Sequence, residues 1–413
     1  AKLPYAMGQA AAHMLTVGDS GGKKAGILFS SFGFAAVFTA LRDWFLKIPA
    51  FIWFQNMVSY GSLGAVWLSP MLISVGYLVG PIFVGVWFAG ALIGDVGILM
   101  LGQKIGFVNE LTAPQIKSTL GLGLMVGSGI GIFIKNIFPN IKSMWIAMRT
   151  KDSSETPIFS RKIIPVLLLC MGFLFVTVLD IPLLASIITL LGVWLAVAMS
   201  CQTVGMSAIN PMEVFAIVVL ILARFVSPSI SEISAVFIAA IVATACGLVG
   251  DIMNDFKTGH ILKTDPKAQW TAEVFGSLIG AVVSATVILA IVTAYGKTAF
   301  GDPHLFPAAQ ASAVAVMAGG IPNIPVFIVA MIFSAALYII GFYPVMTLGL
   351  GVYLPFYLSC TAFIGAGIRF IIDRLYPKFE KNGIGSVIAA GLLGGEAVVG
   401  VIIAIILAMQ FVL

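Results

Sequence analysis

The sequence predicts an all-α protein that crosses a membrane about twelve times. Of its 413 residues, 60% are hydrophobic and only 9% are charged, and the mean hydropathy is +1.10. A soluble domain usually carries about 25% charged residues, so this chain has too few charges to cover a water-facing surface. The apolar residues also form long blocks rather than thin stripes, which is the pattern that a bilayer requires.

The apolar blocks predict twelve spans in order. They lie near residues 25–46, 49–67, 69–101, 117–138, 163–179, 181–199, 212–226, 232–250, 271–294, 325–342, 347–372 and 386–412. Segment 49–67 differs from the others because it contains Gln55, Asn56, Ser59 and Tyr60. We count it as a span because of the positive charges on either side of it.

Positive charges predict the orientation of the spans. Lys and Arg concentrate in the N-terminal stretch up to Lys24, in residues 135–162 and in residues 251–267. By the positive-inside rule all three stretches lie in the cytoplasm. An even number of spans must then separate each pair, which requires segment 49–67 to cross the membrane. The net charge of +5 is therefore an orientation signal and not a nucleic-acid footprint.

Several functional classes lack their signatures here. The four cysteines form no C-x-x-C pair and show no metal-ligand spacing, so we expect small buried hydrophobic side chains. His13, His260 and His304 are far apart in the sequence, and we expect them to be structural. No ATP-binding motif, H-E-x-x-H or nucleophile elbow is present. We therefore expect no enzyme activity, no metal site and no cofactor.

Three collinear blocks of identical residues indicate an internal repeat. The paired positions differ by 247 in the first block (His13 with His260, Gly33 with Gly280), by 275 in the second (Gly76 with Gly351, Gly90 with Gly365) and by 268 in the third (Gly123 with Gly391, Gly127 with Gly395). The increase from 247 to 275 predicts an insertion in the second copy, at residues 295–322.

The repeat predicts how the chain is divided. Residues 1–138 would form the second part of repeat one (spans 5–8), residues 139–162 a basic cytoplasmic linker, and residues 163–413 a complete repeat two (spans 9–16). The four opening spans of repeat one would precede Ala1. We therefore expect the full protein to consist of two parallel eight-span repeats, a known plan for transporters.

Five short stretches resemble motifs of the oligopeptide transporter family, in the family's order. They are LPYAMG at residues 3–8, GYLVGP at 76–81, DIMNDFKTGH at 251–260, GVYLP at 351–355 and GGEA at 394–397. The resemblance, to a prokaryotic member, implies proton-driven secondary uptake of small peptides or siderophore-like metal chelates across the cytoplasmic membrane. Ala6 and Met7 stand where the family often has Pro and Glu, and the NPG and KIPPR motifs of the peptide-transporting branch are absent.

Two acids in the predicted spans are candidates for proton coupling. Glu396 lies well inside the last span, between Gly395 and Ala397, where small neighbours allow another helix to approach closely. Asp95 lies in span 69–101. A carboxylate at mid-membrane is costly, so such a residue is a functional candidate by default. The alternative for Glu396 is a structural hydrogen bond.

Two interrupted spans are the candidate substrate site. Gly76, Tyr77 and Gly80 precede Pro81, and Gly351 and Tyr353 precede Pro355 at corresponding places in the second copy. Broken helices in both halves of a transporter indicate its binding site. We expect the two breaks to face each other across a central cavity, with Tyr5 of the LPYAMG stretch as a further contact. Two packing kinks are the alternative.

Four further charged residues lie at helix starts or close to span ends. Glu213 and Glu273 stand at helix starts, where the helix dipole favours an acid, so we expect structural roles. Arg224 and Arg369 lie close to span ends and can snorkel.

The expected partners are the lipid bilayer, a small-molecule substrate and protons, with no nucleic acid and with a homo-oligomer left open. A channel or facilitative pore is the alternative function, and an intramembrane enzyme is a more distant one.

Overall fold

The computed structural model describes most of the chain. It covers residues 22–140, 142, 163–207, 210–298, 300–301, 308–381 and 383–412, together with residues 3, 5, 7–9, 11, 12, 15 and 16. The expected basic linker at 139–162 lies almost wholly outside these residues, as do His13 and His304. The described part is built of helices with one small two-stranded sheet, which confirms the predicted fold class.

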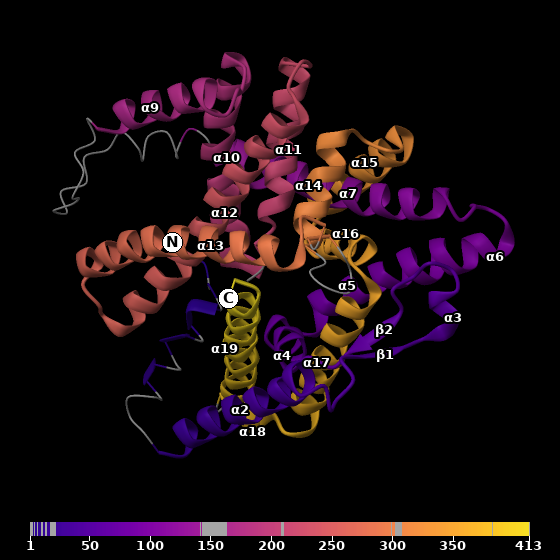
Figure 1. Cartoon of the computed structure of the whole chain (residues 1–413), viewed down its shortest axis with the longest axis vertical. Helices are drawn as coiled ribbons and strands as arrows, with labels where there is room; N and C mark the ends of the chain where they lie inside the picture. The colour runs from indigo at the N-terminus through magenta and orange to yellow at the C-terminus, as the bar shows by residue number, and fades with distance from the viewer. Residues whose placement is uncertain are drawn as a thin grey trace.

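Figure 1 shows the elements, and their bounds are as follows. The first part of the chain holds α2 (Lys23–Thr39), η1 (Ala40–Trp44), β1 (Phe51–Trp53), α3 (Gln55–Val58), β2 (Ala65–Trp67), α4 (Pro70–Val79), α5 (Pro81–Ala91), η2 (Leu92–Gly102), α6 (Gln103–Ile105), α7 (Thr112–Ile132), η3 (Phe133–Ile137) and η4 (Phe138–Asn140). The second part holds α9 (Ile163–Thr177), α10 (Leu183–Ser207), α11 (Met212–Val226), α12 (Glu232–Leu262), α13 (Pro266–Tyr295), α14 (Ala309–Gly319), α15 (Ile324–Ile340), α16 (Val345–Tyr353), α17 (Phe356–Leu375), α18 (Pro377–Lys381) and α19 (Ile384–Val412).

Within the described residues, eight helical segments are long and apolar enough to cross a membrane. They are Lys23–Trp44, Pro81–Ile105, Thr112–Asn136, Leu183–Gly205, Glu232–Leu262, Pro266–Thr293, Phe356–Leu375 and Ile384–Ile403. Four shorter apolar helices accompany them, at Pro70–Val79, Pro165–Thr177, Gln310–Gly319 and Ile324–Ile340. A polytopic membrane protein is therefore confirmed, with short helices at several places where the sequence predicts full spans.

The prediction that segment 49–67 crosses the membrane is wrong. This segment folds as an antiparallel hairpin in which Phe51 pairs with Trp67, and its polar residues form the short helix α3 and the turn that follows. The Thr361 hydroxyl bonds to both the backbone N–H and the carbonyl of Trp67, at 2.9 and 3.0 Å, so helix α17 satisfies the outer edge of the hairpin. The count of spans that relied on this segment therefore fails with it.

Both predicted breaks are present. Helix α4 ends at Gly80, whose φ of 95° is a conformation that residues with a Cβ rarely adopt, and Pro81 then starts α5. In the second copy, α16 ends at Leu354, and α17 begins after Pro355. Each break therefore separates a half-helix of nine or ten residues from a longer helix.

The half-helix before each break packs directly against the helix that follows the other break. A Cβ at Gly76 would lie 1.9 Å from the carbonyl oxygen of Ala362, and a Cβ at Gly351 would lie 1.8 Å from that of Trp87. Adding 275 to Gly76 and Trp87 gives Gly351 and Ala362, so each contact becomes the other when the copies are exchanged. Because only glycine allows such close approach, these positions serve packing in this conformation. The expected cavity between them is not where these glycines meet.

A second pair of helices gives a different correspondence from the one that the sequence predicts. Gly127 of α7 faces the carbonyl of Met331 in α15, and its repeat partner Gly395 of α19 faces the carbonyl of Phe32 in α2. Phe32 and Met331 differ by 299, so the packing relates α2 to α15 and not to α13. The spacing between these packed partners is thus 299 before the hairpin and 275 after it, whereas the repeat division and the insertion expected at 295–322 stay predictions.

Helices α9, α10 and α11 lie in the upper part of Figure 1. Helices α10, α11 and α12 pack on one another and on α7 around a core that includes Phe215, Ile217, Leu220 and Ile238. The described N-terminal residues join these helices, because the Tyr5 hydroxyl donates to the carbonyl of Cys201 in α10 at 3.1 Å.

Candidate functional site

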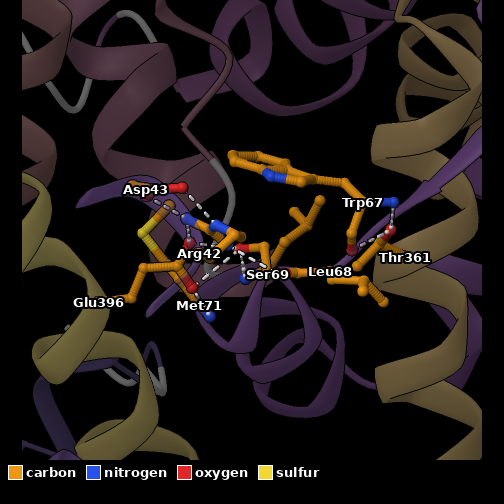
Figure 2. Close-up of polar contacts among 9 residues, drawn as sticks. Arg42, Asp43, Trp67, Leu68, Ser69, Met71, Thr361 and Glu396 are labelled. Carbon is orange, nitrogen blue, oxygen red and sulfur yellow. Dashed lines mark hydrogen bonds and ion pairs between the residues drawn. The ribbon is translucent and has the colours of Figure 1, made fainter. Parts of the chain in front are cut away.

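A buried ion pair stands at the start of the half-helix α4. Glu396 of α19 is 4% exposed, and its carboxylate accepts hydrogen bonds from Arg42 Nη2 at 2.9 Å, from Ser69 Oγ at 3.0 Å and from the backbone N–H of Met71 at 2.6 Å (Figure 2). Three chain segments, η1, the start of α4 and α19, therefore meet at one carboxylate. Gly395 makes this possible, because it lets α19 pack closely on α2.

Arg42 uses its whole guanidinium group in this site. Its Nε and Nη2 donate to the two carboxylate oxygens of Asp43 at 2.6 and 2.7 Å, and its Nη1 donates to the carbonyl of Leu68 at 2.6 Å. The guanidinium carbon lies 5.7 Å from the ring centroid of Trp67, within cation–π range. Figure 2 shows the arginine placed between the two acids. The planar fork of arginine suits this arrangement in a way that lysine would not.

Ser69 connects the ion pair to the backbone of α4. It is the N-cap residue of that helix, and its Oγ accepts from the backbone N–H of Leu72 at 3.1 Å while it donates to Glu396. The N–H groups at a helix start carry a partial positive charge. Glu396 is therefore held by a full cation, by a hydroxyl and by the positive end of a half-helix.

A second buried pair joins the hairpin turn to α7. Asp95 in η2 is completely buried, accepts from Ser62 Oγ at 2.6 Å, and pairs with Lys117 Nζ of α7 at 2.7 Å. Lys117 also lies 3.5 Å from the carbonyl oxygen of Leu354, at the end of the half-helix α16. Asp95 falls in a π-helical stretch, a form that is often found at functional sites.

The first break receives a cation in a similar way. Arg369 of α17 donates from Nη1 to the carbonyls of Tyr77 and Leu78 at 3.0 Å each, at the end of α4. The Tyr77 hydroxyl donates to Glu380 at 2.7 Å. Carbonyls freed at a helix end need such donors where water is scarce. In both breaks a cation from the other copy supplies the donor.

The structure thus brings together some of the predicted site residues and separates others. Glu396 lies at the start of α4, whereas Gly76, Tyr77 and Gly80 lie along it and at its end. Gly351 and Tyr353 belong to the second break, beside Asp95 and Lys117. The contacts of Tyr5 are with Cys201 and Gly205 of α10 and not with either ion pair.

Sequence reasoning missed Arg42, Ser69 and Lys117. Arg42 and Lys117 were available as signals, because both are charged residues within predicted spans and such residues need a partner. Ser69 gave no comparable signal, since serine is common in helices of every kind. Only the packing of α19 on α2 and α4 identifies its role.

Two of the described cavities lie away from these residues. One of about 910 Å³ is bounded by α12 and α13 and is lined by Asp251, Asp255 and Glu273 among others. Another of about 500 Å³ lies among α7, α10, α11 and α15 and is almost wholly apolar. In the part of the chain that the structure describes, no three His, Cys, Asp or Glu side chains are placed to hold a metal ion.

Comparison with known proteins agrees with this architecture. Residues 1–407 match the family model described as OPT oligopeptide transporter protein. A Haemophilus influenzae protein provisionally named an oligopeptide transporter is 28% identical over 200 residues, which cover 42% of this chain and 32% of that protein. The metal-nicotianamine transporters YSL2 and YSL3 of Arabidopsis thaliana are 28% and 24% identical over 40% and 64% of this chain. These matches span 29% and 41% of the two plant proteins, and all three relatives are named as transporters.

Proposed function

Because this chain belongs to the oligopeptide transporter family, we propose that it carries small peptides or metal chelates across a membrane by secondary active transport. The relatives named above support both substrate classes: one is named for oligopeptides and two for metal-nicotianamine complexes. The chain spans less than half the length of those relatives, so the activity is proposed for the protein as a whole. The cytoplasmic membrane of a prokaryote is the proposed location.

The observation that best supports this function is the Arg42–Glu396 pair at the start of α4. The two side chains are only 3% and 5% exposed, and they lie in a chain of which 60% of the residues are hydrophobic. Buried charges inside membrane proteins are costly and mark functional positions. Half-helices near the bilayer midplane are also a recurring feature of the binding sites of secondary transporters.

Proton coupling would act through the buried acids. Protonation of Glu396 removes its negative charge, which weakens its attraction to Arg42 and to the start of α4. Asp95 would act in the same way on Lys117 at the second break. Each event loosens a buried contact at the end of a half-helix, and a change of solvent access between two states is what alternating access requires. Tyr77, Tyr353 and the glycines of the breaks would then be uncovered for substrate.

A channel is the alternative function. The direct packing of Gly76 on Ala362 and of Gly351 on Trp87 favours a carrier, because it leaves no open path between the breaks in this conformation. A channel would require a pore-lining surface, and these contacts do not provide one.

Uptake by reconstituted protein tests the proposal. Proteoliposomes with an imposed pH gradient, acidic outside, are given radiolabelled trialanine or iron–nicotianamine. We expect accumulation of at least one of them above its external concentration, and loss of that accumulation with a protonophore. The Glu396→Gln variant should lose accumulation but keep exchange of the substrate, whereas the exposed Glu110→Gln should behave as wild type. Uptake that ignores the gradient, at rates that do not saturate, would contradict a carrier.

A further inference from the structure

Glu213 is a buried acid that neither ion pair uses. It lies in the first turn of α11 and is 5% exposed, and its Oε2 has no hydrogen-bond partner among the described residues. The residues that follow it, Val214 and Phe215, are also buried in the main apolar core. The position at a helix start predicts a structural role, but a structural acid would use both of its oxygens.

Among the described residues, the cations on the helices around Glu213 are remote from it or engaged elsewhere. Helix α7 meets this part of α11 at Gly129, which is twelve residues from Lys117, a distance of about 18 Å along a helix. Lys135 in η3 follows Gly129 by six residues, but it donates to the carbonyl of Ile339 and lies over the ring of Tyr343. Helix α12 meets it at Gly247, which lies beside Met212 and is ten residues from Lys257. Helix α10 contains no Lys, Arg or His between Leu183 and Ser207, and α14 contains none between Ala309 and Gly319.

The other titratable side chains on the elements packed against this end of α11 supply no positive charge. Cys246 of α12 is buried, and its carbonyl accepts from the Asn210 side chain just before α11. Asp251, five residues further along α12, is itself an acid and lines the cavity bounded by α12 and α13. Tyr353, the last residue of the half-helix α16, packs on the same core and is within electrostatic range of Glu213. Arg224 stands at the opposite end of α11, eleven residues away.

The contrast with Glu396 is informative. Glu396 has an arginine, a hydroxyl and a backbone N–H around its two oxygens. Glu213 also stands at a helix start, but its Oε2 is unpaired and no described cation faces it, and burial of a carboxylate without a counter-charge is strongly unfavourable. A buried acid in that situation takes up a proton instead.

We infer that Glu213 is a proton-binding site of the transport cycle and is protonated in the conformation shown here. The inference rests on the proposed transport function and identifies one group that carries the proton. Release of the proton requires water to reach Glu213. Because Tyr353 at the end of α16 packs on the same core as Val214 and Phe215, a movement of that half-helix would change the surroundings of Glu213.

Infrared spectroscopy tests the protonation state without a substrate. The protein in lipid membranes at neutral pH should show the carbonyl stretch of a protonated carboxylic acid. Glu213→Gln should remove that band, whereas Glu232→Gln, an exposed acid in the first turn of α12, should leave it unchanged. Glu213→Asp, which keeps the acid, should retain a shifted band and serves where the Gln variant fails to fold. A band that persists in both Glu213 variants at its wild-type position and intensity would overturn the assignment.

Proton movement separates this inference from the proposed function. Pyranine inside the proteoliposomes reports proton entry when trialanine or iron–nicotianamine is added. We expect wild type and Glu232→Gln to acidify the interior, and Glu213→Gln to lose that signal. Acidification by Glu213→Gln equal to wild type would refute the role of Glu213 while leaving proton-coupled transport intact. No acidification by wild type with either compound would instead refute the proposed coupling.

Discussion

Arg42 and Glu396 should respond very differently to neutralisation, although they form one ion pair. In the Arg42→Met variant, Glu396 keeps Ser69 and the Met71 N–H as donors but has no counter-charge. Removal of one partner from a buried pair typically costs about 3–5 kcal/mol of unfolding free energy. We expect a loss in that range, because Glu396 is only 5% exposed.

The Glu396→Gln variant should lose less. Arg42 would still donate to both oxygens of Asp43 and to the carbonyl of Leu68, so its charge stays compensated. What is lost is a charge-assisted hydrogen bond, worth about 1.5–3 kcal/mol. The double variant should cost less than the two single losses added together, because neither charge then remains unpaired.

Reversible unfolding in mixed lipid–detergent micelles, followed by tryptophan fluorescence, gives the three free energies. Lys23→Met at the exposed start of α2 is the control for loss of a cation, and it should change stability by less than about 1 kcal/mol. A Glu396→Gln variant that is as unstable as Arg42→Met would refute the reasoning. It would mean that Asp43, whose side chain is 33% exposed, does not balance Arg42.

Two further predictions concern the second break and the packing between copies. Lys117→Met should cost about 3–5 kcal/mol, since Asp95 is then buried without a counter-charge; the double variant with Asp95→Asn should recover much of this, and the exposed Lys104→Met should have little effect. Thermal unfolding of the three variants checks this, and a Lys117→Met protein as stable as Lys104→Met would contradict it. Gly90→Ala should prevent correct folding, because its Cβ would lie 2.1 Å from a backbone carbonyl of α16, whereas Gly85→Ala in the same helix meets nothing within 4 Å and should gain up to about 1 kcal/mol. Gel filtration of the two variants in detergent separates these outcomes, and an equally monodisperse Gly90→Ala would refute the packing argument.

The sequence was sufficient to predict the class of fold and the two breaks. Long apolar blocks can be read directly as membrane helices, because a bilayer leaves the backbone few alternatives. Gly80 with Pro81, and Pro355 in the second copy, interrupt such a helix by local chemistry alone. For the same reason Glu396 and Asp95 could be selected as buried acids, since a charge inside an apolar block has to be accommodated somewhere.

Local sequence was misleading wherever the outcome depended on distant partners. Segment 49–67 contains enough apolar residues for a short span, but its strands are satisfied by each other and by Thr361, which lies almost three hundred positions away. The spacing of 299 between Phe32 and Met331 becomes visible only when Gly127 and Gly395 are seen to face their carbonyls.

The partners of each acid were decided by tertiary structure alone. Glu396 and Glu213 are both single acids in apolar helices, and the sequence predicts proton exchange for the first and a structural role for the second. In the fold, Arg42 and the start of α4 reach Glu396, while Oε2 of Glu213 has no hydrogen-bond partner among the described residues. A carboxylate is stable in an apolar medium only with donors and a counter-charge around it, and these come from segments far apart in the chain. The sequence therefore determined that buried acids would be present, and the packing of the helices determined which of them is paired.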